Sequence, residues 1–196
     1  MTIDEWTSLD EDVPGELVSG ELIEEEMPDF VHELVVIWLS MMLWPWVTAR
    51  GGVIGGSDAK YIVARDRGRK ADLSVFFSGR LPPRRGSIRV PPDLFVEVVT
   101  ATPRDERRDR VEKLDEYEKF GVQHYWIVDP ELRILDAYTL RRGRYSRALS
   151  TNARIRRLPG FPGLEIDLRK LWAQIDRLPD VPTPPASRPR RAKRRR

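Results

Sequence analysis

The pattern of apolar and polar residues along the chain predicts one long helix and several short strands. Between residues 28 and 44, apolar side chains recur at helical spacing with few polar residues among them, which predicts a heavily buried helix. Pro28 suits the first turn of this helix, and Pro45 is expected to end or kink it. Three shorter apolar runs have the length of strands, at residues 73–77, 94–99 and 125–128.

Weaker signals predict hairpins and terminal elements around these runs. Apolar pairs on either side of Ser19-Gly20 predict a hairpin over residues 16–26. Val53-Ile54 predicts a short strand, with residues 61–63 as its continuation or partner and residues 65–69 as a turn. The remaining expected elements are a short helix over residues 2–9, a hairpin of residues 133–140 and 144–149, a strand over 161–166 and a helix over 168–175.

A charged segment, residues 103–120, separates the second and third apolar runs and is expected to be helical. Two strands joined across a helix usually run parallel in one sheet. The predicted fold class is therefore α/β, with a mixed β-sheet flanked by helices and preceded by the N-terminal hairpin and long helix. Residues 1–175 are expected to form one domain, and residues 176–196, rich in Pro and Arg, a disordered tail.

Two carboxylates stand in or beside the apolar runs, and they carry the candidate chemistry. Asp72 precedes the first run and Glu97 lies inside the second. Burying an ionised carboxylate costs several kcal/mol unless it is compensated, and a shared divalent cation would compensate both. Lys113, on the following helix, could add positive charge beside them. The alternative is that both runs are edge strands with a solvated face, and that Lys113 forms a surface pair with Asp109.

The order of these residues resembles that of the PD-(D/E)XK nuclease superfamily. More closely, the chain resembles the Uma-type restriction-endonuclease-like family, a domain family of unknown function. Ala71 stands where the superfamily motif has Pro, and Val99 where it has Lys. The Uma-type family has an apolar residue at that second place and a Lys on the next helix, which matches Lys113. The matching segments are residues 16–22, 70–73, 95–99, 109–117 and 121–130.

The resemblance implies a metal-dependent endonuclease that hydrolyses phosphodiester bonds, with DNA as the expected substrate. It implies one Mg²⁺ (or Mn²⁺) held by Asp72 and Glu97, with the backbone carbonyl of Val98 and the side chain of Glu21 as further ligands. Lys113 would be catalytic, orienting the attacking water.

The two histidines are expected to be structural. The family often has a His near the position of His32, but a core or helix-cap role is favoured for it. For His124, packing at a strand end is favoured over catalysis.

Composition narrows the class of protein. The chain has no cysteine, which excludes disulfides and thiolate metal sites, and two histidines make a His-rich zinc site improbable. The acidic N-terminus lacks the apolar segment of a signal peptide. The run over residues 35–47 is too short to span a bilayer and contains Pro45. A cytoplasmic protein is therefore expected.

Charge is distributed unevenly along the chain. From Arg177 onward there are eight basic residues and one acid, about +7, which leaves about −4 of the net charge of +3 for the rest. Runs of Arg bind phosphate backbones without reading bases, although a solubility tail is an equally good interpretation. The residues expected to contact nucleic acid are Arg84, Arg85 and Arg89 in a loop over residues 78–92, and Arg190, Arg191, Lys193 and Arg194 in the tail.

Two other functions fit the same sequence. Ala71, Val99 and the basic tail fit a non-catalytic nucleic-acid-binding protein built on a nuclease fold. Trp38, Trp44 and Trp46 fit a protein-interaction module in which the long helix packs in a homodimer, because exposed aromatic patches mark interfaces.

Overall fold

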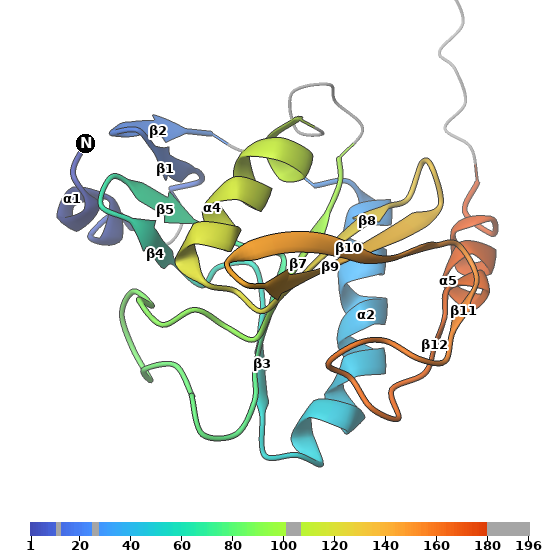
Figure 1. Cartoon of the computed structure of the whole chain (residues 1–196). Helices are drawn as coiled ribbons and strands as arrows, with labels where there is room; N and C mark the ends of the chain where they lie inside the picture. Colours follow the sequence, from blue (N-terminus) through green and yellow to red (C-terminus); the bar gives the residue numbers. More distant parts are fainter. Residues whose placement is uncertain (11–12, 25–27, 101–106, 180–196) are drawn as a thin grey trace, which may run out of the picture.

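The centre of the computed structural model, which describes residues 1–10, 13–24, 28–100 and 107–179, is a six-stranded sheet ordered β10-β9-β8-β7-β6-β3 (Figure 1). β7 and β8 run parallel and the other neighbours antiparallel. This confirms the predicted mixed α/β fold and its parallel pair. The strands are β3 (Val53–Gly55), β6 (Leu73–Phe76), β7 (Leu94–Val98), β8 (His124–Asp129), β9 (Ile134–Arg141) and β10 (Arg144–Thr151).

Helices cover both faces of this sheet because the side chains of each strand alternate between them (Figure 1). Leu94, Val96 and Val98 of β7 pack in one core with α2 (Phe30–Thr48) and α5 (Leu168–Ile175). Phe95 and Val99 pack in a second core with Tyr117 of α4 (Lys113–Phe120). A π-helical turn, η1 (Arg108–Glu112), leads directly into α4. Glu97 therefore faces α4.

A smaller sheet, ordered β2-β1-β5-β4, forms the N-terminal side of the molecule. Its strands are β1 (Glu16–Val18), β2 (Glu21–Ile23), β4 (Tyr61–Ala64) and β5 (Arg67–Arg69). The helix α1 (Ile3–Thr7) lays Trp6 against β5 at Gly68, where an added Cβ would lie 2.3 Å from the indole ring. A third, two-stranded sheet pairs β11 (Arg154–Ile155) with β12 (Ile166–Asp167).

The structure differs from the expected secondary structure in two regions, residues 61–69 and residues 161–166. Residues 65–69 were expected to be a turn, but residues 67–69 are a strand that pairs with β4. The strand was hidden because its charged residues are satisfied by buried ion pairs, as with Arg69, and not by solvent. The expectation that residues 61–63 continue or pair with the strand of Val53-Ile54 was wrong, because β4 pairs with β5 and β3 pairs with β6. Of the strand expected over residues 161–166, only its last residue is extended, as part of β12.

The long helix α2 runs through Pro45, which was expected to end or kink it. It begins after Asp29, whose carboxylate accepts a hydrogen bond from the backbone N–H of His32 at 2.8 Å, and it continues to Thr48. Proline removes only the hydrogen bond that residue 45 would donate to the carbonyl of Met41, and Met41 is an exposed residue of α2. Trp46 fixes the last turn by donating to the carbonyl of Pro162 at 2.9 Å.

The sequence predicts a heavily buried helix, but burial of α2 is one-sided, with Phe30, Ile37, Met41 and Trp44 exposed. Its 19 residues are long and apolar enough to cross a bilayer by length and composition, contrary to the shorter run taken from the sequence. However, one face of the helix is built into the domain core. Its residues there are Val35, Leu39, Leu43 and Val47, all fully buried. This identifies α2 as a core helix that leaves an apolar face outward.

Candidate active site

Asp72 and Glu97 lie together at one end of the central sheet. β6 and β7 pair with Leu73 opposite Val96, so extending this register by one position sets Asp72 opposite Glu97. Opposite residues of an antiparallel pair point to the same face. Oδ2 of Asp72 accepts a hydrogen bond from the backbone N–H of Val98, the neighbour of Glu97, at 2.6 Å. β6 and β7 are interior strands, so the alternative that both acids lie on solvated edge strands is wrong.

Glu97 is a buried carboxylate with two direct donors. Lys113 donates to its Oε2 at 3.0 Å, and the hydroxyl of Tyr117 donates to its Oε1 at 2.7 Å. Burial raises the pKa of Glu97 well above its usual value, with the nearby charges of Asp72, Asp109 and Glu16 adding to the increase, although Lys113 opposes it. Added positive charge beside Glu97 would therefore stabilise the ionised form of its carboxyl group.

Lys113 is buried among carboxylates and is not part of a surface pair. Besides Glu97, its ammonium lies 3.4 Å from Oε1 of Glu16 and 3.5 Å from Oδ1 of Asp109. Asp109 and Lys113 are i and i+4, and the π-helical turn between them is continuous with α4. Burial raises the pKa of Asp109 despite the opposing charges of Lys113 and Arg108. The helix therefore positions the ammonium of Lys113 over the face of the central sheet that carries Glu97.

The hairpin acid that reaches this cluster is Glu16, whereas the sequence favoured Glu21. Glu16 is buried, and its carboxylate also accepts hydrogen bonds from Arg69 at 2.7 Å and the backbone N–H of Lys70 at 2.8 Å. Burial alone would raise its pKa, but Lys113 and Arg69 outweigh burial and lower it. Glu21 is exposed beside the hairpin turn, opposite Val18. Glu16 therefore replaces Glu21 as the candidate from this hairpin.

His32 also belongs to the cluster, although sequence reasoning favoured a core or cap role for it. From the first turn of α2, its Nε2 lies 3.3 Å from Oδ2 of Asp72. Burial tends to lower the pKa of His32, but the hydrogen bond and charge of Asp72 outweigh burial and raise it. The only signal for this contact was the histidine that the Uma-type family often has near this position.

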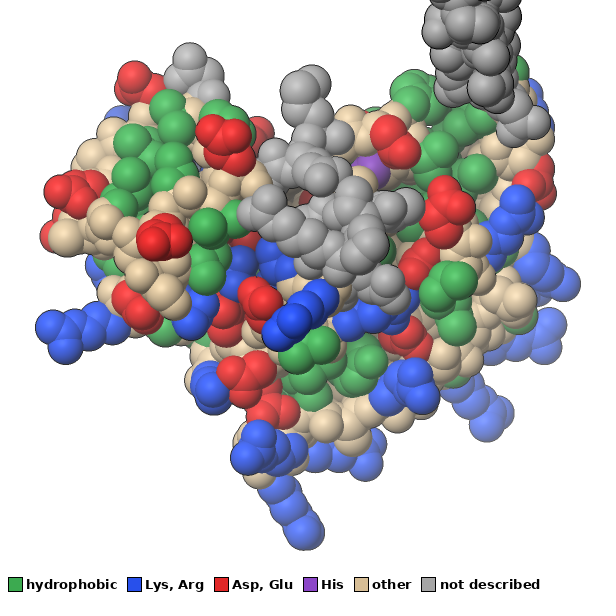
Figure 2. Space-filling model, turned by 90° about the horizontal axis from the view of Figure 1, so that it is seen from above, with side chains coloured by type: hydrophobic (Ala, Val, Ile, Leu, Met, Phe, Trp, Pro, Cys, Tyr) green, Lys and Arg blue, Asp and Glu red, His purple; other side chains and the backbone are tan. Residues whose placement is uncertain are grey.

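The structure does not bring the predicted nucleic-acid contacts to this cluster. Arg84, Arg85 and Arg89 are exposed, but their loop leaves the carboxyl end of β6 and enters the amino end of β7. Asp72 and Glu97 lie at the opposite ends of those strands. Other Lys and Arg side chains surround the lower and right-hand rim of the face seen from above (Figure 2). The tail arginines and Lys193 lie outside the described residues.

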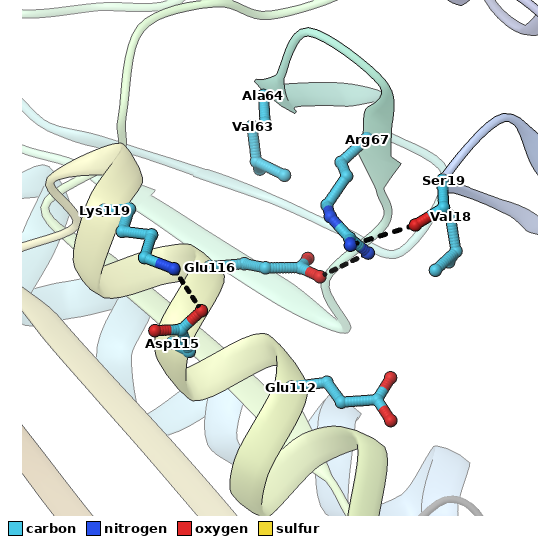
Figure 3. A pocket seen from close by; sticks show the side chains of 9 residues that line it. All are labelled: Val18, Ser19, Val63, Ala64, Arg67, Glu112, Asp115, Glu116 and Lys119. Atoms are coloured by element: carbon cyan, nitrogen blue, oxygen red, sulfur yellow. Dashed lines mark hydrogen bonds and ion pairs between the residues drawn. The ribbon is translucent and has the colours of Figure 1, made fainter.

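A pocket of about 550 Å³ lies between the small sheet and α4 (Figure 3). In it, Arg67 reaches from β5 to the carboxylate of Glu116 at 3.0 Å and to the hydroxyl of Ser19 at 3.0 Å. Glu116 also receives two hydrogen bonds from Arg69, which in turn holds Glu16. A chain of charged contacts thus runs from the pocket to the cluster around Lys113.

The residues present fit a divalent cation that draws part of its coordination from water and substrate. Within the described ranges, no group of three or more His, Asp or Glu residues is arranged to hold a metal. Asp72 and Glu97 nevertheless offer two carboxylates, which suffices for Mg²⁺ because it keeps several waters and binds substrate phosphates. Burial raises the pKa values of Glu97 and Asp109, and a bound cation would favour the ionised form of each carboxylate.

Comparison with known proteins supports the fold. The central sheet and its helices have the fold of restriction-endonuclease-like nucleases. The chain belongs to the Uma2 family, described as "Putative restriction endonuclease", whose model matches residues 3–169. A similar solved structure is described as "a putative nuclease belonging to DUF820 from Anabaena variabilis ATCC 29413". It shares 21% sequence identity with a TM-score of 0.70, over 88% of this chain and 98% of that one. No curated protein matches the sequence.

Proposed function

We propose that this protein is a metal-dependent endonuclease that hydrolyses phosphodiester bonds in DNA. The observation that carries the proposal is the placement of Asp72 and Glu97 on adjacent interior strands, with the buried ammonium of Lys113 bonded to Glu97. A structural ion pair would not need a second acid opposite the first in an apolar sheet, because each buried charge adds a desolvation cost. Membership of a restriction-endonuclease-like family supports the same reaction class.

Asp72 and Glu97 would hold one Mg²⁺ or Mn²⁺. The N–H and C=O of one strand residue point to the same edge of the strand. The N–H of Val98 points to Asp72, so its carbonyl faces the same side and is available as a further ligand. When bound, such an ion neutralises charge on the phosphate and lowers the pKa of a bound water. His32 keeps Asp72 in place through its contact with Oδ2.

Lys113 would act on the scissile phosphate and the attacking water. Its ammonium lies within ion-pair distance of Glu97, Glu16 and Asp109, so it is positioned beside Glu97, one of the two proposed metal-binding acids. Such a preorganised donor stabilises the negative charge that develops on phosphate oxygens in the transition state. Val99, at the place of the superfamily lysine, is buried in the core beneath α4. The lysine therefore comes from the helix instead of the strand.

Cleavage of supercoiled plasmid DNA tests the proposal. With Mg²⁺ or Mn²⁺ present, we expect the wild-type chain to nick or linearise the plasmid, and Asp72→Asn, Glu97→Gln and Lys113→Met each to reduce the rate at least ~100-fold, as loss of a transition-state contact does. Glu16→Gln should reduce it less, because Glu16 acts through Lys113. Glu131→Gln, at an exposed acid in the turn before β9, is the matched control and should cut like the wild type.

Calorimetric titration with Mn²⁺ separates cleavage from mere binding of nucleic acid. We expect binding by the wild-type chain that is lost in both Asp72→Asn and Glu97→Gln. A chain that binds DNA in a salt-sensitive way, takes up no Mn²⁺ and leaves the plasmid intact would be a non-catalytic nucleic-acid-binding protein, and the endonuclease proposal would then be rejected.

A further inference from the structure

The outward face of α2 carries a stripe of exposed apolar side chains. Phe30, Ile37, Met41 and Trp44, hereafter the α2 stripe, are each between 56% and 69% exposed. They account for four of the nine large apolar residues that are exposed in the described part of the chain. Single exposed apolar residues are ordinary on protein surfaces, but a contiguous set on one helix marks an interaction surface.

The spacing of the stripe is symmetric about Ile37. Phe30 precedes Ile37 by seven residues and Trp44 follows it by seven, and seven residues are close to two helical turns, so all three lie on one side of α2. A second copy of the helix, crossing antiparallel at Ile37, would set Phe30 against the partner's Trp44 and Ile37 against the partner's Ile37. The same symmetry operation sets Met41 opposite the partner's Glu33 and Leu34. The stripe is therefore complementary to itself.

We propose that the protein forms a two-fold symmetric homodimer through the α2 stripe. A groove of about 470 Å³ lies beside the amino-terminal half of the stripe, between α2 and α5, and it would receive the partner's Met41. The groove is lined by Leu34, Trp38 and Met42 of α2, with Lys170 and Gln174 of α5 at its rim. An isologous interface of this kind needs one self-complementary patch on each copy.

The exposed area of the α2 stripe supplies about half of what a stable dimer buries on each partner. The four side chains of the stripe expose roughly 400–500 Å² per copy, and the groove beside them brings the patch toward the ~800 Å² per partner of a stable interface. The chain's own tail is a poor occupant, because eleven of the seventeen residues from 180 to 196 are Pro, Lys or Arg, and Val181 is their one large apolar side chain. α2 could enter a bilayer with only one of its faces, because the opposite face is packed in the domain core.

Sedimentation velocity of the full chain tests the dimer. We expect the wild-type chain to move from the 22.8 kDa monomer to twice that mass as concentration rises. Ile37→Glu should weaken association at least ~100-fold, because it sets two carboxylates face to face at the two-fold axis. Leu132→Glu, an equally drastic change at an exposed apolar residue outside α2, should dimerise like the wild type. Circular dichroism spectra should show both variants folded.

Single cysteines test the register, since the chain has none of its own. Ile37→Cys should form a disulfide-linked dimer under mild oxidation, because antiparallel helices in contact bring such residues within the reach of a disulfide. Phe30→Cys alone should remain uncross-linked, and Phe30→Cys combined with Trp44→Cys should cross-link. A wild-type chain that stays monomeric, a dimeric Ile37→Glu chain, or a stripe that instead carries the monomer onto lipid vesicles would each overturn the proposal.

Discussion

At the scale of single residues, the buried acids differ in how visible they are in the sequence. Asp72 and Glu97 could be found because each stands beside or inside an apolar run, where a carboxylate needs an explanation. Glu16 could not be separated from the acids that follow it, since only the packing of the hairpin shows which of them turns inward. The sequence ranked Glu21 above it, but Glu16 contacts Lys113 and Glu21 is exposed.

The pKa of His124 is governed mainly by burial of its side chain. It lies at the start of β8, packed against the ring of Phe161 at 4.8 Å between centroids, and its Nδ1 lies 3.4 Å from the hydroxyl of Thr139. Gly160 approaches so closely that an added Cβ would lie 2.3 Å from Nε2. Burial lowers the pKa of His124 to about 4, although the charge of Asp93 opposes this. The expected role in strand-end packing agrees with these contacts.

We therefore predict that His124 makes the fold sensitive to acid. Because the imidazole stays neutral in the fold but is protonated in the unfolded chain below its ordinary pKa of 6.5, the free energy of unfolding falls as pH decreases from 6.5 to 4. The loss should approach about 3 kcal/mol. Urea unfolding at pH 7 and pH 4.5 should show that His124→Phe is more stable relative to the wild type at the lower pH. An equal difference between the two proteins at both pH values would contradict this assignment.

At the scale of elements, one arginine ties the small sheet to the helix over the active site. Arg69 of β5 has no exposed surface, and it donates to Glu116 of α4 at 2.7 and 2.9 Å and to Glu16 of β1 at 2.7 Å. Of these two acids, Glu16 also contacts Lys113, and Glu116 lines the pocket of Figure 3. The position of the hairpin relative to α4 thus depends on this buried ion pair.

Removing that arginine should destabilise the fold strongly. Arg69→Met leaves Glu16 and Glu116 buried without their main partner, and breaking a buried pair in this way costs about 3–5 kcal/mol. Arg67→Met is the matched control, because Arg67 contacts the same Glu116 but is partly exposed, and its loss should cost about 1 kcal/mol or less. Guanidinium unfolding curves give the loss in the free energy of unfolding for each variant. Similar losses for the two variants would show that the ion pairs of Arg69 do not hold the small sheet against α4.

Most strands and helices that the sequence predicted correctly have a strong apolar period, although the charged helix α4 was also expected, from its place between two apolar runs. The βαβ unit and the hairpin of β9 and β10 follow from such runs. β5 was missed because two of its three residues are arginines, and charge normally signals a turn. The helix end at Pro45 was misplaced because contacts with Pro162, distant in sequence, hold the last turn of α2. Long-range pairing, which no local pattern encodes, decided both cases.

At the scale of the whole molecule, positive charge is concentrated at the carboxyl-terminal end of the sequence. Seven basic residues and Asp180 lie beyond residue 179, a balance of +6, so the remaining residues carry −3 of the net +3. A domain with net negative charge does not attract a polyanion by itself. We therefore expect residues 180–196 to supply most of the long-range attraction for DNA.

Binding to a duplex at several salt concentrations tests this expectation. The full chain should bind more tightly than a chain ending at Pro179, and its affinity should fall more steeply with salt, by ~0.9 in logarithmic slope for each phosphate contact that the tail makes. The two chains should converge at high salt. Parallel salt dependences for the two chains would assign the phosphate contacts to the domain instead of the tail.

The cluster around Lys113 draws on five separated segments: the hairpin of Glu16, the start of α2, the start of β6 with Asp72, β7 with Glu97, and the helix α4. A polypeptide still being synthesised, or one truncated before residue 113, holds the acids without the ammonium that completes the group. Under the proposed function, chains truncated before residue 113 would therefore carry no assembled centre and should not cleave DNA.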